Sequence, residues 1–169
     1  ELICMKLLAI DGNSLINRAF YGVRPLSSPK GVPTNAVYGF LNMYLKLIDE
    51  HNPECVCVCF DVHAKTFRHI EYQGYKAQRK PMPEELRPQI PLLKEVLTLM
   101  GVNIVEQAGI EADDIIGTIA KHTKIQTYIY TGDKDSFQLV DEETSVCFTK
   151  RSITDLDVYN NDNFTEKST

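Results

Sequence analysis

The sequence predicts an α/β fold in which helices cover both faces of a central, mostly parallel sheet. Short apolar runs alternate along the chain with segments whose apolar residues recur at helical spacing. The apolar runs are nearly continuous, which is typical of strands buried on both faces of a parallel sheet. The length of 169 residues fits one domain over residues 1–169.

The first half of the chain predicts two strands and two helices. Met5–Ile10 is an apolar run that ends at an Asp-Gly pair, as a buried strand would. Ser14–Tyr21 follows as a short helix before a loop rich in Pro, Ser and Gly. Asn35–Asp49 places apolar residues three and four positions apart, which indicates an amphipathic helix. Val56–Phe60 is the second strand, and Asp61 follows it.

The second half continues the alternation. An amphipathic helix is expected within Pro83–Met100, and Gly101 is suited to the left-handed residue that ends many helices. The remaining expected elements are a strand at Val102–Val105, a helix at Ala112–His122, and strands at Thr127–Tyr130 and Val146–Thr149.

Composition excludes several classes of protein. No apolar run approaches the ~20 residues of a membrane span, and the N-terminal residues are too short and acidic for a signal peptide. We therefore expect a cytoplasmic protein. Cys55, Cys57 and Cys59 would share one face of a strand, at a spacing that suits a tetrahedral zinc site poorly. We interpret them as reduced, buried cysteines.

Acidic side chains follow four of the predicted strands. The carboxyl ends of parallel strands meet at one edge of a sheet, so these carboxylates would converge on one pocket. Crowded negative charges need cations, and oxygen ligands alone favour Mg²⁺ or Mn²⁺ over zinc. The candidate ligands are Asp11, Asp61, Glu111, Asp113, Asp114, Asp133 and Asp135.

Each acid also has an ordinary structural explanation. Asp11-Gly12 and Gly132-Asp133 could be turns, and the acids of EADD could favour a helix N-terminus. Their joint placement is what predicts a shared metal site. Two other acidic-pocket folds fit poorly: a haloacid-dehalogenase-type phosphatase needs an Asp where Asn13 stands, and a receiver domain needs neither EADD nor a basic segment.

A basic segment lies beside this acidic site, although the chain has a net charge of −5. Residues 63–94 contain seven Lys or Arg and three Glu. Cations that hold phosphates, interleaved with tyrosines that stack on bases, form a plausible surface for single-stranded nucleic acid. A solvated charged loop is the alternative. The candidate phosphate-binding side chains are Arg18, Lys65, Arg68, Lys76, Arg79 and Lys80.

Five stretches together resemble one known family. They are LLAIDGNSLINRAFYG, AVYGFLNMYLKLI, VCFDVHAKTFRHIEYQGYKAQRKPMPEELRPQI, GIEADDIIGTIA and TGDKDSFQLV, in this order. The set resembles the 5′-nuclease domain of bacterial DNA polymerase I, with a PIN-like, flap-endonuclease (resolvase-like) core. The resemblance covers residues 5–140, and EADD alone would not be specific.

The resemblance implies roles for particular residues. The seven acids would hold two divalent ions, Mg²⁺ or Mn²⁺, and the substrate would be DNA with a 5′ flap, a nick or a single-stranded 5′ end. Tyr75, Lys76 and Arg79 would lie in a helical arch over the site, with Tyr75 stacking on a base and the two cations holding the scissile phosphate. Arg18 would steer phosphate. The protein would act as a monomer near the bacterial nucleoid, removing primers and flaps in replication and repair.

The sequence departs from the family pattern near its end. The helix–loop–helix region that grips duplex DNA, and the Gly-Asp-x-x-Asp-Asn motif that completes the second metal position, have no match in residues 136–169. We therefore expect a truncated chain, with an incomplete second metal position and weak or absent nuclease activity. A PIN-like ribonuclease and a non-catalytic DNA-binding module remain alternatives.

Overall fold

The computed structural model describes residues 5–62, 81–149 and 156–164. The strands are β1 (Lys6–Asp11), β2 (Cys55–Cys59), β3 (Asn103–Val105), β4 (Gln126–Thr131), β5 (Thr144–Thr149) and β6 (Leu156–Tyr159). The helices are α1 (Gly12–Gly22), α2 (Asn35–His51), α4 (Gln89–Leu99), α5 (Ala112–His122) and the 3-10 helix η1 (Lys134–Leu139).

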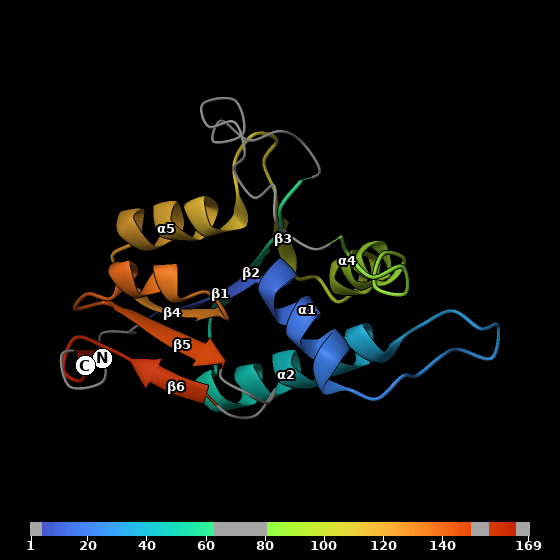
Figure 1. The fold of residues 1–169 in the computed structure, drawn as a ribbon. Helices are drawn as coiled ribbons and strands as arrows, with labels where there is room; N and C mark the ends of the chain where they lie inside the picture. Colours follow the sequence, from blue (N-terminus) through green and yellow to red (C-terminus); the bar gives the residue numbers. More distant parts are fainter. Residues whose placement is uncertain (1–4, 63–80, 150–155, 165–169) are drawn as a thin grey trace.

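The six strands form one sheet in the order β3-β2-β1-β4-β5-β6 (Figure 1). The first five are parallel to their neighbours, and β6 pairs with β5 in the antiparallel direction. This confirms the predicted α/β class with a mostly parallel sheet. It also places β1 in the middle, between β2 and β4, so that the ends of these three strands lie next to one another.

Alternate residues of the central strand pack into two separate cores, one on each face of the sheet. Leu8 and Ile10 belong to the core formed with α1, α2 and α4. Leu7 and Ala9 belong to the core formed with α5 and the side chains of η1. The period-2 alternation of a strand therefore explains why the run is apolar throughout: both of its faces are buried.

Most element bounds agree with the sequence within one or two residues. Strand β5 begins two residues earlier than expected, at Thr144, because the Asp141 carboxylate closes a turn by accepting the amides of Glu143 and Thr144. Two elements were not predicted. Helix η1 starts where the Asp133 carboxylate accepts the amide of Asp135, and β6 is a short strand at the sheet edge.

Helix α4 occupies Gln89–Leu99 within the range expected from sequence. Pro88 precedes its first residue, which fits the preference of proline for helix starts. Gly101 has φ of +75°, as expected for the residue that ends the helix.

Cys57 and Cys59 are free and buried in the same core, whereas Cys55 is exposed. No helix among the described residues has the length and apolar character of a membrane span.

Candidate metal centre

Asp11 lies at the end of the central strand and is 9% exposed. Its Oδ1 accepts the amide of Ser14 at 2.9 Å, which caps α1, and its Oδ2 accepts the hydroxyl of Thr131 at 3.0 Å. Burial raises the pKa of this carboxyl to about 6. The two hydrogen bonds oppose the rise in pKa, and repulsion from Asp61 and Asp113 adds to it. The repelling charges therefore come from an acid just beyond β2 and from one in the first turn of α5.

Asp61 connects the end of β2 to the start of α5 through a hydrogen bond. It lies two residues beyond the last residue of β2, and its Oδ1 accepts the backbone amide of Ala112 at 2.7 Å. Ala112 is the first residue of α5, where backbone amides have no partner within the helix. The contact brings the EADD segment to the same edge of the sheet as Asp11.

Three acids of the EADD segment meet in one cluster. A carboxylate oxygen from each of Glu111, Asp113 and Asp114 lies within 4.8 Å of the others. An ion with oxygen ligands at about 2.1 Å holds opposite ligands about 4.2 Å apart. Small side-chain adjustments would therefore close these three oxygens around one cation. The all-oxygen donor set suits a hard divalent ion.

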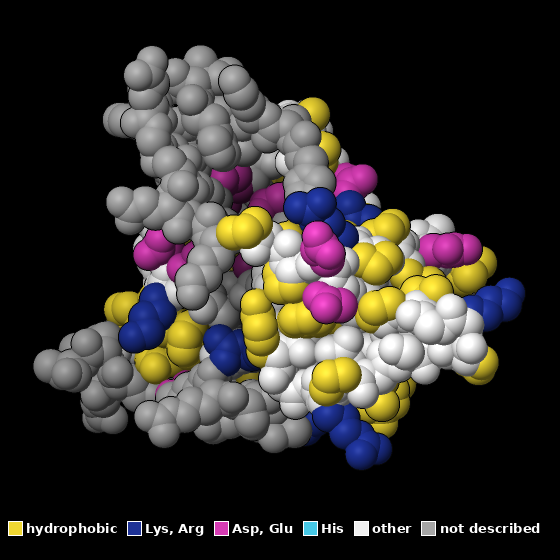
Figure 2. All heavy atoms as spheres, turned by 45° about the vertical axis from the view of Figure 1, so that its right-hand side comes forward, with side chains coloured by type: hydrophobic (Ala, Val, Ile, Leu, Met, Phe, Trp, Pro, Cys, Tyr) yellow, Lys and Arg dark blue, Asp and Glu magenta, His cyan; other side chains and the backbone are white. Residues whose placement is uncertain are grey.

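Acidity alone does not mark this site, because Asp and Glu side chains occur at several separate places on the face shown in Figure 2. The EADD cluster is distinguished by its geometry. Glu111 is 4% exposed, and the oxygens of all three acids converge. Carboxylates held this close together repel one another unless a cation neutralises them.

Asp133 and Asp135 approach the site from β4 and η1. The amide of Asp133 donates to the Thr131 hydroxyl at 3.0 Å, and the Thr131 hydroxyl also bonds to Asp11. Both acids are exposed. Asp135 lines a cavity of about 410 Å³ between α5 and η1, together with Asp113 and Asp114. The seven predicted acids therefore all lie at the carboxyl edge of the sheet.

Arg18 reaches the turn that carries Asp133. A Cβ placed on Gly132 would lie 2.7 Å from the Ser14 hydroxyl and 3.1 Å from Nη2 of Arg18. Ser14 and Arg18 are four residues apart, so both face this turn from the same side of α1. The structure thus places the guanidinium beside the acidic edge.

Two hydroxyl residues at this edge were not singled out as site residues from sequence. Thr131 bridges Asp11 and Asp133, and the Ser14 hydroxyl accepts the amide of Gly132 at 2.8 Å. A polar last residue on a buried strand, directly before an acidic turn, was the signal available for Thr131.

The structure does not describe most of the predicted phosphate-binding residues. The helical-arch segment falls within residues 63–80, outside the described ranges. The residues concerned are Lys65, Arg68, Tyr75, Lys76, Arg79 and Lys80.

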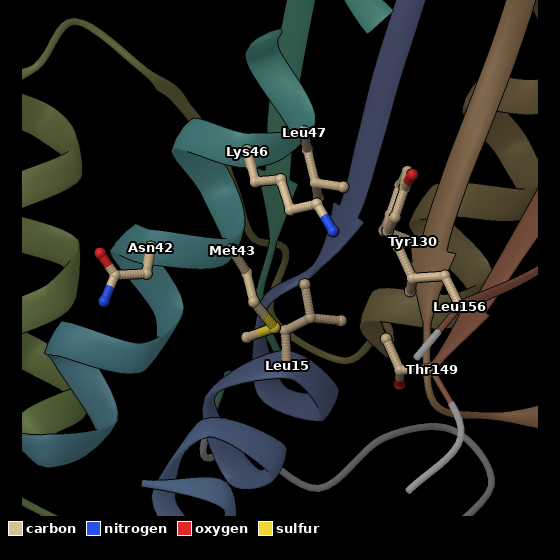
Figure 3. A pocket seen from close by; sticks show the side chains of 8 residues that line it. All are labelled: Leu15, Asn42, Met43, Lys46, Leu47, Tyr130, Thr149 and Leu156. Atoms are coloured by element: carbon tan, nitrogen blue, oxygen red, sulfur yellow. The ribbon is translucent and has the colours of Figure 1, made fainter. Parts of the chain in front are cut away.

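A second cavity, of about 70 Å³, lies between α1, α2 and β4 (Figure 3). Leu15, Met43, Leu47 and Tyr130 point into it from α1, α2 and β4. Among the described residues its lining includes no carboxylate, so it suits a hard cation poorly.

A family model described as the 5′-3′ exonuclease, N-terminal resolvase-like domain, matches residues 6–169. The chain belongs to this family. This exonuclease-family chain is 42% identical over 168 residues to DNA polymerase I of Caldicellulosiruptor bescii. The alignment covers 96% of this chain and 20% of that protein. It is 45% identical over 146 residues to a 5′-3′ exonuclease of Aquifex aeolicus, covering 84% of this chain and 50% of that protein. The chain thus spans about a fifth of the polymerase's length and half of the exonuclease's.

Solved structures share the fold of this exonuclease-family domain. The T5 5′-exonuclease with bound zinc superposes with a TM-score of 0.69 at 21% identity, covering 96% of this chain and 60% of that one. Flap endonuclease-1 from Methanococcus jannaschii superposes with a TM-score of 0.63 at 17% identity, covering 95% and 58%. These likenesses confirm the resolvase-like architecture predicted from sequence.

Proposed function

We propose that this chain is the catalytic core of a metal-dependent 5′–3′ exonuclease and flap endonuclease. It would hydrolyse phosphodiester bonds near DNA 5′ ends, as part of a DNA polymerase I or of a separate exonuclease. The observation that carries the proposal is the gathering of carboxylates, several of them held by hydrogen bonds, from the ends of β1 and β2, the start of α5 and the β4–η1 turn. Family membership and the names of the relatives support the same reaction.

The seven acids would hold the divalent ions. Glu111, Asp113 and Asp114 already converge, and the negative charges of Asp61 and Asp113 act on Asp11. We propose Mg²⁺ or Mn²⁺ as the ions, with a second position that this chain does not complete. Such ions, when bound, activate water and stabilise the leaving oxygen of a phosphodiester.

The protein's own contribution is to position the DNA. Arg18, beside the acidic edge, would attract and orient a phosphate. Lys76 and Arg79 would hold the scissile phosphate, and Tyr75 would stack on a base. Lys65, Arg68 and Lys80 would add contacts to the phosphate backbone. These six roles remain proposals, because the residues lie outside the described ranges.

The proposed substrate is DNA with a 5′ flap, a nick or a single-stranded 5′ end. Primer and flap removal in the bacterial cytoplasm, at the nucleoid, is the proposed role, and a monomer is the proposed form. The solved relatives include a bacteriophage T5 flap endonuclease in complex with DNA and metal ions, which supports DNA as the partner.

Two measurements on the chain test this function. The melting temperature should rise with Mn²⁺, because an ion that binds only the folded state stabilises it by about 2.7 kcal/mol at 100 times its Kd. A 5′-labelled flap duplex should be cleaved slowly, and only with Mg²⁺ or Mn²⁺ present. Asp113→Asn should lose both effects.

The controls separate the alternatives. A matched RNA flap should be cleaved more slowly than DNA, and the opposite preference would favour a PIN-like ribonuclease. Binding of flap DNA without Mn²⁺ stabilisation would indicate a non-catalytic DNA-binding module. Either result would contradict the proposed function.

A further inference from the structure

One buried hydroxyl lies between two of the proposed metal ligands. Thr131 is the last residue of β4 and is 1% exposed. Its Oγ1 is 3.0 Å from Oδ2 of Asp11 and 3.0 Å from the backbone nitrogen of Asp133. The two acids it joins come from sites more than 100 residues apart in the chain.

The direction of these two hydrogen bonds is determined by their chemistry. The amide of Asp133 can only donate, so the Thr131 oxygen accepts from it. The hydroxyl proton is then left for the Asp11 carboxylate, which accepts it through Oδ2. A hydroxyl is needed for this bridge, because a group that only donates or only accepts would lose one of the two bonds.

Ser14 forms a parallel connection from α1. Its amide donates to Oδ1 of Asp11, and its hydroxyl accepts the amide of Gly132 at 2.8 Å. Both oxygens of Asp11 are therefore oriented by hydrogen bonds, and consecutive amides of the β4–η1 turn are anchored by the same two hydroxyl residues. The relative placement of Asp11 and the acidic turn depends on Thr131 and Ser14.

We propose that Thr131, assisted by Ser14, is a positioning residue that sets the placement of Asp11 against Asp133 and thereby the affinity of the site for divalent ions. The inference rests on the proposed function, since it assumes that these acids are ligands. Neither hydroxyl needs to touch the ion. Hydrogen-bond partners that orient ligands typically contribute 10- to 100-fold to metal affinity.

The test compares two identical substitutions on one strand. Thr131→Val removes the bridging hydroxyl and nearly preserves side-chain volume. Thr127→Val is the matched control, because Thr127 is also on β4, is 0% exposed, and bonds the carbonyl of Ile125 at the opposite end of the strand. Thr131→Ser keeps the hydroxyl and serves as the rescue variant. Mn²⁺ affinity is measured by calorimetry on the folded chain, independently of nuclease activity.

We expect Thr131→Val to bind Mn²⁺ about 10- to 100-fold more weakly than the wild type. Thr127→Val should bind like the wild type, and Thr131→Ser should bind within a few-fold of it. Wild-type affinity in Thr131→Val, or an equal loss in Thr127→Val, would overturn the inference and leave the proposed function intact. A wild type that binds no Mn²⁺ would overturn both.

Ser14→Ala provides a second variant should Thr131→Val fail to fold. Ser14 is only half-buried, and the substitution removes one hydrogen bond without disturbing the bond from its amide to Asp11. A loss of Mn²⁺ affinity approaching about 10-fold is expected. An unchanged affinity in Ser14→Ala would overturn the inference on its own.

Discussion

Oδ1 of Asp61 lies 2.7 Å from the backbone nitrogen of Ala112 and accepts its hydrogen bond. The acid thus caps helix α5 from just beyond the end of strand β2, while its charge also acts on Asp11. Glu111, the residue that precedes the helix, makes no side-chain capping bond there. One carboxylate therefore contributes both to the stability of α5 and to the acidic cluster.

Asn and Ala substitutions at Asp61 should separate these two contributions. Asp61→Asn keeps an oxygen that can accept the Ala112 amide, so the free energy of unfolding should stay within about 0.5 kcal/mol of the wild type. Asp61→Ala loses the bond and should cost about 1–2 kcal/mol. Both variants should lose most of the Mn²⁺-induced rise in melting temperature. Equal unfolding free energies for Asn and Ala would contradict the capping contact.

Asp11 should give the metal-free chain a characteristic pH dependence. Its pKa is about 6 in the folded chain, against an ordinary value of 3.8. Between pH 4 and pH 6 the folded chain keeps a proton that the unfolded chain has released. Folding stability should therefore fall as pH rises through this window, and the loss should be complete above about pH 6. The difference between the two pKa values corresponds to about 3 kcal/mol at most.

Urea unfolding at pH 4 and pH 7 measures this loss. Asp11→Asn should lose less stability than the wild type between the two pH values, because Asn does not titrate. Asp49→Asn, on the exposed surface of α2, should behave like the wild type and serves as the control. The same pH dependence in Asp11→Asn and the wild type would show that Asp11 is not buried as described.

Gly132 should tolerate no side chain. An added Cβ would lie 2.7 Å from the Ser14 hydroxyl, so Gly132→Ala should destabilise the fold by about 1–3 kcal/mol. The same change in a Ser14→Ala background should cost less, because the nearest atom is then absent. Urea titration of the four proteins in this cycle measures the difference.

Gly117→Ala is the matched control for that cycle. Gly117 lies within helix α5, and a Cβ added there would be 3.4 Å from the Leu139 side chain, an ordinary van der Waals distance. Alanine favours the helix there, so neutral to modestly stabilising behaviour is expected. If the double variant lost as much free energy of unfolding as Gly132→Ala and Ser14→Ala lose together, this would argue against a close approach between these residues.

Gln89 should be a strong stability determinant away from the metal centre. It is 0% exposed, and its Oε1 accepts the amides of Ala36 and Val37 at the start of α2. Gln89→Leu would leave these amides buried without a partner, and we expect a loss of about 3 kcal/mol or more. Gln107→Leu, on the exposed surface, should change stability by less than about 0.5 kcal/mol. The midpoint of thermal unfolding compares the two.

Much of the fold could be predicted because its signals are local. Apolar runs and helical spacing located five of the six strands and all four α-helices among the described residues. Strand β6 has only four residues, most of them half-buried or exposed. Its sequence therefore contains no apolar run that would predict a strand. The structure also confirms that the acids follow the strands, because residues just after a strand stay near its end whatever the strand order.

Non-local contacts were beyond the reach of these patterns. Gln89 lies in an amphipathic helix, where a polar residue is ordinarily solvated, yet it is buried because it caps a helix more than 50 residues away in sequence. In the sequence, Thr131 looks like an ordinary β-branched strand residue. Its role follows from its hydrogen bond to Asp11, which only the structure shows. In both cases a partner distant in the chain decides the side chain's role.

The sequence by itself determined the α/β class, the order of the main elements and the positions of seven acids at strand ends. It could do so because strand and helix periodicity and chain direction are properties of neighbouring residues. Only the tertiary structure decided that β1 lies between β2 and β4. It also decided that Asp61 caps α5, and that the hydroxyls of Thr131 and Ser14 join Asp11 to the β4–η1 turn. Hydrogen bonds have short range and strict geometry, so these contacts exist only once distant segments have packed together.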